Sequence, residues 1–218
     1  MNKIDIFDSV KSKAINELSP EILEIAIDSV TKSEIIKDIP IFGLAFKGYD
    51  LYKNVTESFF IKKILKFLYE LNSIPLDERM AFIEKLESDE KVSNAGEKLI
   101  VILNRLDDID KAEIIGKLFK HTILESIEFS TFQRLTHIIN NAYIHDLKLL
   151  KNNKHLSYIS PDVKSHLHQV GLLNQSISDI EKQRKRQIRT GSSSTAIPQP
   201  MFEYTTNEYC KILMEFGF

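Results

Sequence analysis

The stretch NVTESFFIKKILKFLYEL, residues 54–71, decides the fold. Its apolar residues recur mostly at steps of three and four, which is the period of an α-helix. Asn54 and Glu57 have capping-box spacing, and Pro75 disfavours helix at residue 74, so both ends of the helix are marked. The apolar stripe is wide for a surface helix, so we expect this helix at the centre of a helical bundle. The stripe consists of Phe59, Phe60, Ile61, Ile64, Leu65, Phe67, Leu68 and Leu71.

The sequences on both sides of residues 54–71 predict partner helices for this stripe. Ser19 followed by Pro20 marks a helix start, because the missing N–H of proline costs little at the first helical position. Three aspartates, Asp107, Asp108 and Asp110, lack the glycine and glutamate of a calcium loop, so we expect them to cap a helix. The expected helices span residues 3–18, 20–30, 75–87, 89–106, 109–125 and 131–150, with a short helix or turn at 33–38.

The composition is that of a chain that can build a core without disulfides. Of 218 residues, 43% are hydrophobic, and the formal net charge is −2, which argues against wholesale polyanion binding but permits a local basic patch. The single cysteine, Cys210, cannot form an internal disulfide, so a reducing compartment is expected. Residues 1–10 lack a signal-peptide pattern. We therefore predict a soluble cytoplasmic protein.

The most apolar run, residues 39–51, is shorter than the roughly 20 residues that span a bilayer. Gly43 and Gly48 lie within it and favour a buried helix that a neighbour approaches closely. The alternative is a membrane-touching or pore-forming segment that works with the lysine-bearing helix after it. Residues 39–71 are therefore the candidate membrane-acting surface.

The composition changes at residues 151–154, Lys-Asn-Asn-Lys, which we take as a domain boundary. Beyond it, Ser160-Pro161 starts a helix that Gly171 ends, and a strand, a long polar segment, a strand over 202–206 and a helix over 207–216 follow. The predicted fold class is mainly α, with a multi-helix bundle over residues 1–152. A small α+β module that resembles a winged helix follows over residues 153–218.

A run of basic residues lies where the wing of a winged helix would be, within a flexible loop over residues 178–200. The candidate nucleic-acid-binding residues are Lys182, Arg184, Lys185, Arg186 and Arg189. Basic wings contact phosphates, and such binding is strongly salt-dependent. A solvated loop and contact with an acidic partner are the alternatives. No aromatic residue is interleaved with these charges, so stacking on single-stranded bases is not supported.

The remaining reactive residues do not form a recognisable catalytic or metal-binding pattern. His137 and His145 lie on one predicted helix, and His166 and His168 on another, without the three or four converging ligands that zinc needs. Cys210 lies in an apolar helical pattern and is expected to be buried. The sequence contains no nucleophile elbow and no phosphate-binding glycine loop. We expect no metal, no cofactor and no enzymatic activity.

Several short segments resemble a family of bacterial helical proteins without assigned activity. More distantly, they resemble abortive-infection proteins, which act in phage defence and carry a helical body with a short winged-type tail. The similarity covers about residues 1–150 and implies a bacterial cytoplasmic setting and a role in the response to phage. It brings no catalytic residues. The segments are Asp38-Ile39-Pro40-Ile41, Phe60-Ile61-Lys62-Lys63-Ile64, Phe67-Leu68, Glu78-Arg79, Asn104-Arg105-Leu106-Asp107, Lys111-Ala112 and Gly116-Lys117-Leu118-Phe119.

Three functional hypotheses follow. The first is a non-enzymatic interaction or accessory protein in bacterial defence, with a protein partner or self-association. The second is a nucleic-acid-binding regulator that uses the C-terminal module. The third is a membrane-acting effector that uses residues 39–71.

Overall fold

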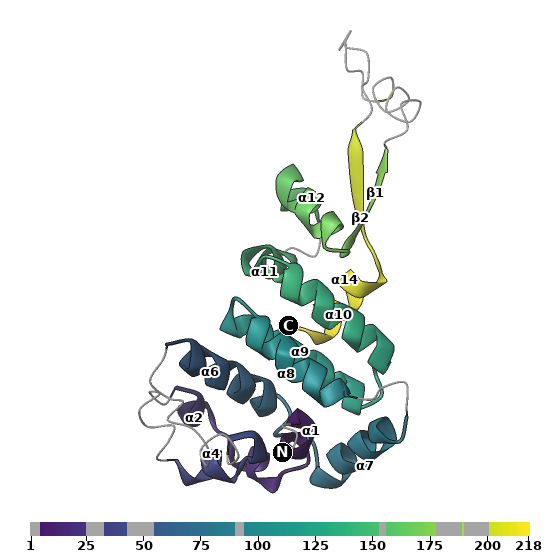
Figure 1. The fold of residues 1–218 in the computed structure, drawn as a ribbon. Coiled ribbons are helices and arrows are strands. Elements are labelled where there is room, and N and C mark those ends of the chain that lie inside the picture. Colours follow the sequence, from purple (N-terminus) through teal and green to yellow (C-terminus); the bar gives the residue numbers. More distant parts are fainter. Residues whose placement is uncertain are drawn as a thin grey trace.

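A stack of helices carries one two-stranded ribbon that projects from it (Figure 1). The computed structural model describes residues 5–24, 33–42, 55–89, 94–152, 156–177, 189 and 201–218. Within these ranges the chain is mainly helical, and the ribbon lies near its C-terminal end. The predicted fold class is therefore confirmed at the level of a helical body followed by a small part with two strands.

The helix over residues 54–71 has the central place that its sequence predicts. Helix α6 (Val55–Tyr69) packs along α9 (Ile109–Ile123) over much of its length. Ile64 and Leu68 are completely buried, and Phe60 is half-buried. Its expected cap at Asn54 lies outside the described residues.

The close contact between α6 and α9 requires glycine at position 116. A Cβ atom at Gly116 would lie 2.8 Å from the backbone oxygen of Phe67 and 3.0 Å from Cβ of Glu70. Both distances are shorter than ordinary van der Waals contacts, so a larger side chain would push the helices apart. Gly116 therefore sets the spacing of the central helix pair.

Phe119 of α9 is the centre of an aromatic cluster that joins four other segments of the body. Its ring lies 5.0 Å from that of Phe132, 5.5 Å from Phe67, 5.9 Å from Phe82 and 6.2 Å from Phe7, measured between centroids. These spacings are typical of favourable aromatic pairs. The cluster connects α9 to α10 (Phe129–Asn141), α6, α7 (Leu76–Glu87) and α1 (Ile6–Val10).

The prediction of one helix over residues 3–18 is wrong. The described part contains α1 and a separate 3-10 helix, η1 (Lys13–Glu17). The side chain of Ser12 accepts a hydrogen bond from the backbone N–H of Ala14 at 3.2 Å, so Ser12 starts a new helix. The helix that starts at Pro20 is described as far as α2 (Pro20–Glu24), and the predicted short helix is α4 (Glu34–Asp38). The predicted helix beyond residue 24 and the apolar run after residue 42 lie outside the described residues.

Two further helix boundaries differ from the prediction. Asp89 is not helical, and α8 (Ala95–Arg105) begins after Asn94, whose left-handed φ of 63° cannot continue a helix. The predicted helix over 131–150 is two helices, α10 and α11 (Ile144–Asn152), because Ala142 between them is extended, with ψ 149°. His137 and His145 therefore lie on different helices.

Three buried cationic side chains bind backbone carbonyls of neighbouring segments. Lys63 of α6 donates 2.8 Å hydrogen bonds to the carbonyls of residues 104 and 106, at the C-terminal end of α8. Lys111 of α9 donates to the carbonyl of residue 140 near the end of α10 at 3.3 Å and pairs with Asp107. Arg79 of α7 donates to the carbonyl of Val10 at the end of α1 and to that of Ser12 before η1. Positive charge at a helix C-terminus is favourable, so the two lysines act as caps supplied by other helices.

The C-terminal part returns to the helical body after forming the ribbon. Its elements are η4 (Leu156–Tyr158), α12 (Pro161–Gln169), β1 (Leu173–Ile177), β2 (Phe202–Thr206) and α14 (Glu208–Phe216). Gly171 has a left-handed φ of +95° and ends the α12 segment as predicted. Helix α14 packs on α9 and α10, and its Leu213 is buried in the same core as the other helices. The division at residue 152 stays a prediction.

No helix among the described residues has the length and hydrophobicity needed to cross a membrane.

Candidate functional site

The ribbon of β1 and β2 is the part of the described structure that stands apart from the packed helices (Figure 1). The strands are antiparallel, and their register joins Leu173 to Thr206 at the inner end and Ile177 to Phe202 at the outer end. Directly opposed residues share a face of the ribbon, and the faces alternate along each strand. One face therefore carries the pairs 173/206, 175/204 and 177/202, and the other carries 174/205 and 176/203.

The inner end of the ribbon is held firmly. Leu173 is buried, and its carbonyl oxygen lies 2.8 Å from Nδ1 of His168 on α12. Asn207 donates from its side chain to the carbonyl of Gly171 at 2.7 Å and accepts from the N–H of Cys210 at 3.0 Å. Asn207 therefore caps α14 and closes the base of the ribbon.

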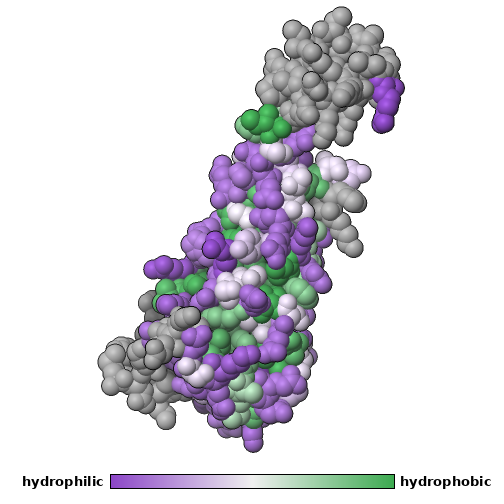
Figure 2. Space-filling view, turned by 90° about the vertical axis from the view of Figure 1, so that its right-hand side faces the viewer, coloured by the Kyte–Doolittle hydropathy of each residue, from purple (hydrophilic) through white to green (hydrophobic). Residues whose placement is uncertain are grey.

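The outer end of the ribbon carries exposed hydrophobic side chains. Ile177 is 69% exposed and Phe202 is 64% exposed, although the two residues face each other across the strands. Hydrophobic surface lies at the outer end of the described ribbon in the space-filling view (Figure 2). Neighbouring apolar side chains that form a contiguous exposed patch can mark an interaction site.

The predicted basic site lies almost entirely outside the described residues. Of Lys182, Arg184, Lys185, Arg186 and Arg189, the structure describes Arg189 alone, which is exposed. The register nevertheless fixes where this segment is attached, since the chain leaves β1 at Ile177 and enters β2 at Phe202. Residues 178–200 contain five basic and two acidic residues, so a net charge of +3 is tethered to the outer end of the ribbon.

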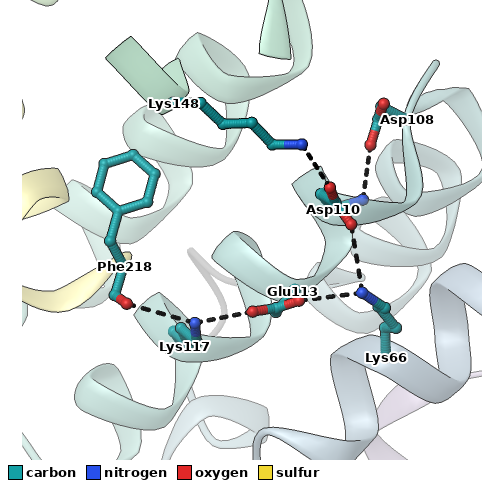
Figure 3. Close-up of polar contacts among 7 residues, drawn as sticks. All are labelled: Lys66, Asp108, Asp110, Glu113, Lys117, Lys148 and Phe218. Atoms are coloured by element: carbon teal, nitrogen blue, oxygen red, sulfur yellow. Dashed lines mark hydrogen bonds and ion pairs between the residues drawn. The ribbon is translucent and has the colours of Figure 1, made fainter. Parts of the chain in front are cut away.

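Figure 3 shows a cluster of charged side chains centred on α9. Lys66 of α6 donates to Asp110 at 3.3 Å and to Glu113 at 3.0 Å, both on α9. Lys148 of α11 donates to Asp110 at 2.7 Å. Lys117 donates to Glu113 at 2.8 Å and to the backbone oxygen of residue 218 at 3.5 Å. The cluster thus joins α6, α9, α11 and the segment after α14.

The pKa directions in this cluster indicate a stabilising role. The hydrogen bond from Lys148 is the main cause that lowers the pKa of Asp110. Burial alone would raise the pKa of Glu113, but hydrogen bonds from Lys117 and Lys66 outweigh it and lower that pKa. Asp108 accepts from the N–H of Asp110 at 2.7 Å, which confirms its predicted place as the N-cap of α9. Each charged side chain drawn in Figure 3 has at least one hydrogen-bond partner, so the arrangement links helices.

The four histidines considered in the sequence as metal ligands, His137, His145, His166 and His168, each contact other groups of the chain. His166 of α12 lies 2.5 Å from the buried Asp146 of α11, measured from Nδ1 to Oδ2, and joins these helices. His137 contacts Asn141, and the ring of His145 lies 5.0 Å from that of Tyr143, tilted by 54°. Across the part of the chain that the structure describes, no three histidine, cysteine or acidic side chains gather as metal ligands.

Cys210 is completely buried in α14, which confirms the expectation from its apolar surroundings. Burial raises the pKa of its thiol to about 11. A thiol that stays protonated at neutral pH is a poor nucleophile, so Cys210 is a packing residue.

The sequence pattern did not reveal the exposed pair at the ribbon end. Ile177 and Phe202 belong to strands whose existence was predicted, but their pairing depends on the register across a gap of 24 residues. Their exposure follows from the projection of the ribbon beyond α12, which no local pattern encodes.

Comparison with known proteins gives no family for this chain. No family model matches the sequence, and no curated protein and no solved structure matches it either.

Proposed function

We propose that this chain is a non-enzymatic nucleic-acid-binding protein that uses the ribbon as an arm. The observation that carries the proposal is the register of β1 and β2, which attaches a segment of net charge +3 to the outer end of a projecting ribbon. Cations on such an arm can reach the phosphates of a duplex while the helical body stays outside. The net charge of −2 for the whole chain makes this segment the main source of attraction to a polyanion.

The order of elements supports the same proposal. Helices α10, α11 and α12 precede the ribbon, and α14 follows it. This order agrees with a winged-helix module in which α12 lies before the wing. The buried contacts of Leu167, Leu172 and Leu173 fix α12 against the start of the ribbon, so both would move as one unit on the nucleic acid.

Salt dependence provides the test. Binding that uses five cation–phosphate contacts predicts a slope of log K against log salt of about −4.5 on B-DNA, since each contact contributes about −0.9. Replacing Arg184, Lys185 and Arg186 by alanine should reduce the slope to about −1.8 and weaken binding at 50 mM salt. Fluorescence anisotropy with a labelled 30-bp duplex measures both quantities.

A matched control removes the same charge from the helical body. Lys13 and Lys98 are exposed and Lys62 is half-exposed, on η1, α8 and α6, away from the ribbon. Their triple alanine variant should keep the slope of the unchanged protein. Equal slopes for the two triple variants would contradict the proposal, because the attraction would then come from net charge alone.

A second candidate is a protein-binding accessory role, including one in phage defence. The exposed apolar end of the ribbon favours it, and so do the outer edges of its two strands, which pair with no other strand among the described residues, because an extended peptide can pair with such an edge. A partner protein that co-purifies with the unchanged chain from its host, and that is lost when β2 carries a proline at Thr205, would support this candidate. The membrane-acting alternative has less support, because α9 covers the apolar side of α6.

A further inference from the structure

The outer pair of the ribbon, Ile177 and Phe202, has an environment unlike that of the other residues on the same face. Leu173 is buried against the core at the inner end. Tyr204 is half-buried, lies against the ring of His168 at 6.2 Å between centroids, and accepts a hydrogen bond from Gln175 at 2.8 Å. Helix α12 therefore covers the inner part of this face, and the cover stops before the last described pair.

The pair stands well away from the body. Ile177 lies four positions after Leu173, and a strand rises about 3.4 Å per residue, so Ile177 lies about 14 Å beyond the buried base. This length is comparable with the depth of a DNA groove, about 8 Å, and leaves room for the phosphate backbone beside the ribbon. The two opposed side chains form one compact apolar projection, because opposed Cβ atoms lie about 5 Å apart.

Charge identifies the partner that fits this projection. The chain that continues from Ile177 brings five basic residues and two acidic ones before it returns to Phe202. An apolar protein partner would gain nothing from this excess of cations. A nucleic-acid duplex presents both features at once, with phosphates at the groove edge and apolar base-pair steps inside it.

We propose that Ile177 and Phe202 form an apolar wedge that inserts between adjacent base pairs of double-stranded DNA and kinks the duplex. This inference rests on the proposed function and adds the class of nucleic acid and the way in which it is deformed. Side chains such as phenylalanine and isoleucine unstack base steps when a basic arm places them in a groove. Pyrimidine–purine steps unstack most easily, so sites that contain TA or CA steps are preferred.

The test separates kinking from binding. A 30-bp DNA duplex with a central TA step carries a donor dye at one end and an acceptor at the other, and energy transfer reports its end-to-end distance. The unchanged protein should raise the transfer efficiency at saturation and should bind this duplex about tenfold more tightly than one with a central A-tract. The double variant Ile177→Ala with Phe202→Ala should bind with the same salt slope but leave the duplex straight, and the preference for the TA step should vanish.

Two further variants make the result specific. Ile177→Leu with Phe202→Leu keeps a wedge of similar volume and should still kink the duplex. Val101→Ala with Leu124→Ala removes exposed apolar side chains from the helical body and should change nothing.

The failure of this inference differs from the failure of the proposed function. If the unchanged protein does not bind the duplex at low salt, the proposed function fails, and the wedge fails with it. If the protein binds without changing the energy-transfer efficiency, or if the double alanine variant kinks the duplex equally, the wedge inference fails and the proposed function stands. Tighter binding to a single strand or to an RNA duplex of the same sequence also overturns the wedge.

Discussion

Replacing Arg79 by methionine should lower the free energy of unfolding by about 2–4 kcal/mol. Arg79 is completely buried, and its guanidinium donates to the carbonyls of Val10 at 2.9 Å and Ser12 at 3.2 Å, and to the side chain of Asn16. These three acceptors belong to the end of α1, to the residue before η1 and to η1 itself. The two helices have only five residues each and are too short to be stable alone. Arg79 therefore holds the N-terminal segment on α7.

The magnitude follows from the acceptors that methionine would leave without a partner. A buried acceptor without its hydrogen bond costs about 1–3 kcal/mol, and Val10 bears this cost in full. The bonds to Ser12 and Asn16 are only partly buried, so water recovers part of their loss. Burial lowers the pKa of Arg79 because it disfavours the charged guanidinium, and the Nε of this group has no hydrogen-bond partner. Removing the charge therefore recovers part of the desolvation cost of burying it. The net loss is therefore smaller than the sum of three bonds.

Urea unfolding followed by circular dichroism measures the loss. The matched control is Arg105→Met, which makes the same chemical change at an exposed position at the end of α8 and should cost less than about 0.5 kcal/mol. Amide exchange over residues 6–17 should increase in the Arg79 variant and stay unchanged in the control. Equal stabilities of the two variants would refute the assignment of Arg79 as the anchor of this segment.

Three other predictions concern ionisable groups. Burial lowers the pKa of His121, whose ring lies 4.6 Å from that of Phe216, so the unfolded chain binds the proton at a higher pH than the folded chain does. The free energy of unfolding should therefore fall as the pH drops below about 6.5, and it should fall less steeply in His121→Phe. Urea unfolding at pH 7 and 5.5 measures both. Because the pKa of Glu113 is lowered in the folded chain, its ionised carboxylate stabilises the fold. This stabilisation is fully present above the unfolded pKa of 4.5 and is lost as the pH falls through the folded pKa. Glu113→Gln should therefore be less stable than the unchanged chain at pH 7, and the difference should shrink by pH 3. Cys210 should react with iodoacetamide at pH 8 far more slowly in the folded protein than in urea, because its pKa is about 11; equal rates would show that α14 opens readily.

The helices that could be predicted from the sequence are those whose signals are local. Helix α6 has a continuous apolar stripe, and α12 has Ser160 and Pro161 at its start and Gly171 after its end. The two strands were also expected from their composition and position. In these cases a few neighbouring residues contain the information, and tertiary packing agrees with it.

The failures arise where a distant contact decides the local structure. An apolar pattern runs through residues 3–18, but the chain breaks at Ser12, and Arg79 from α7 satisfies the carbonyl groups at this break. The pattern over 131–150 likewise continues through the extended Ala142, where Lys111 of α9 binds the carbonyl of Asn140. Hydrophobic periodicity reports which side is buried, and it does not report which backbone groups find a partner elsewhere. Buried cations on other helices supplied those partners.

The position of the ribbon depends on both of its connections to the body. The chain reaches β1 through α12, which His166 ties to Asp146 of α11, and leaves β2 through α14, which Leu213 anchors in the core beside α9 and α10. An isolated two-stranded ribbon is marginal in water, so its stability and direction must come from these two attachments. His121 lies under Phe216 of α14, and its protonation should therefore weaken one attachment and leave the other in place. For an arm that acts by placing Ile177 and Phe202 against a duplex, this argues that acid pH reduces kinking before it reduces binding. Energy transfer reports kinking and anisotropy reports binding, so measuring both on the same duplex at pH 7 and 5.5 separates the two effects. A parallel loss of kinking and binding would show that the direction of the ribbon does not depend on α14.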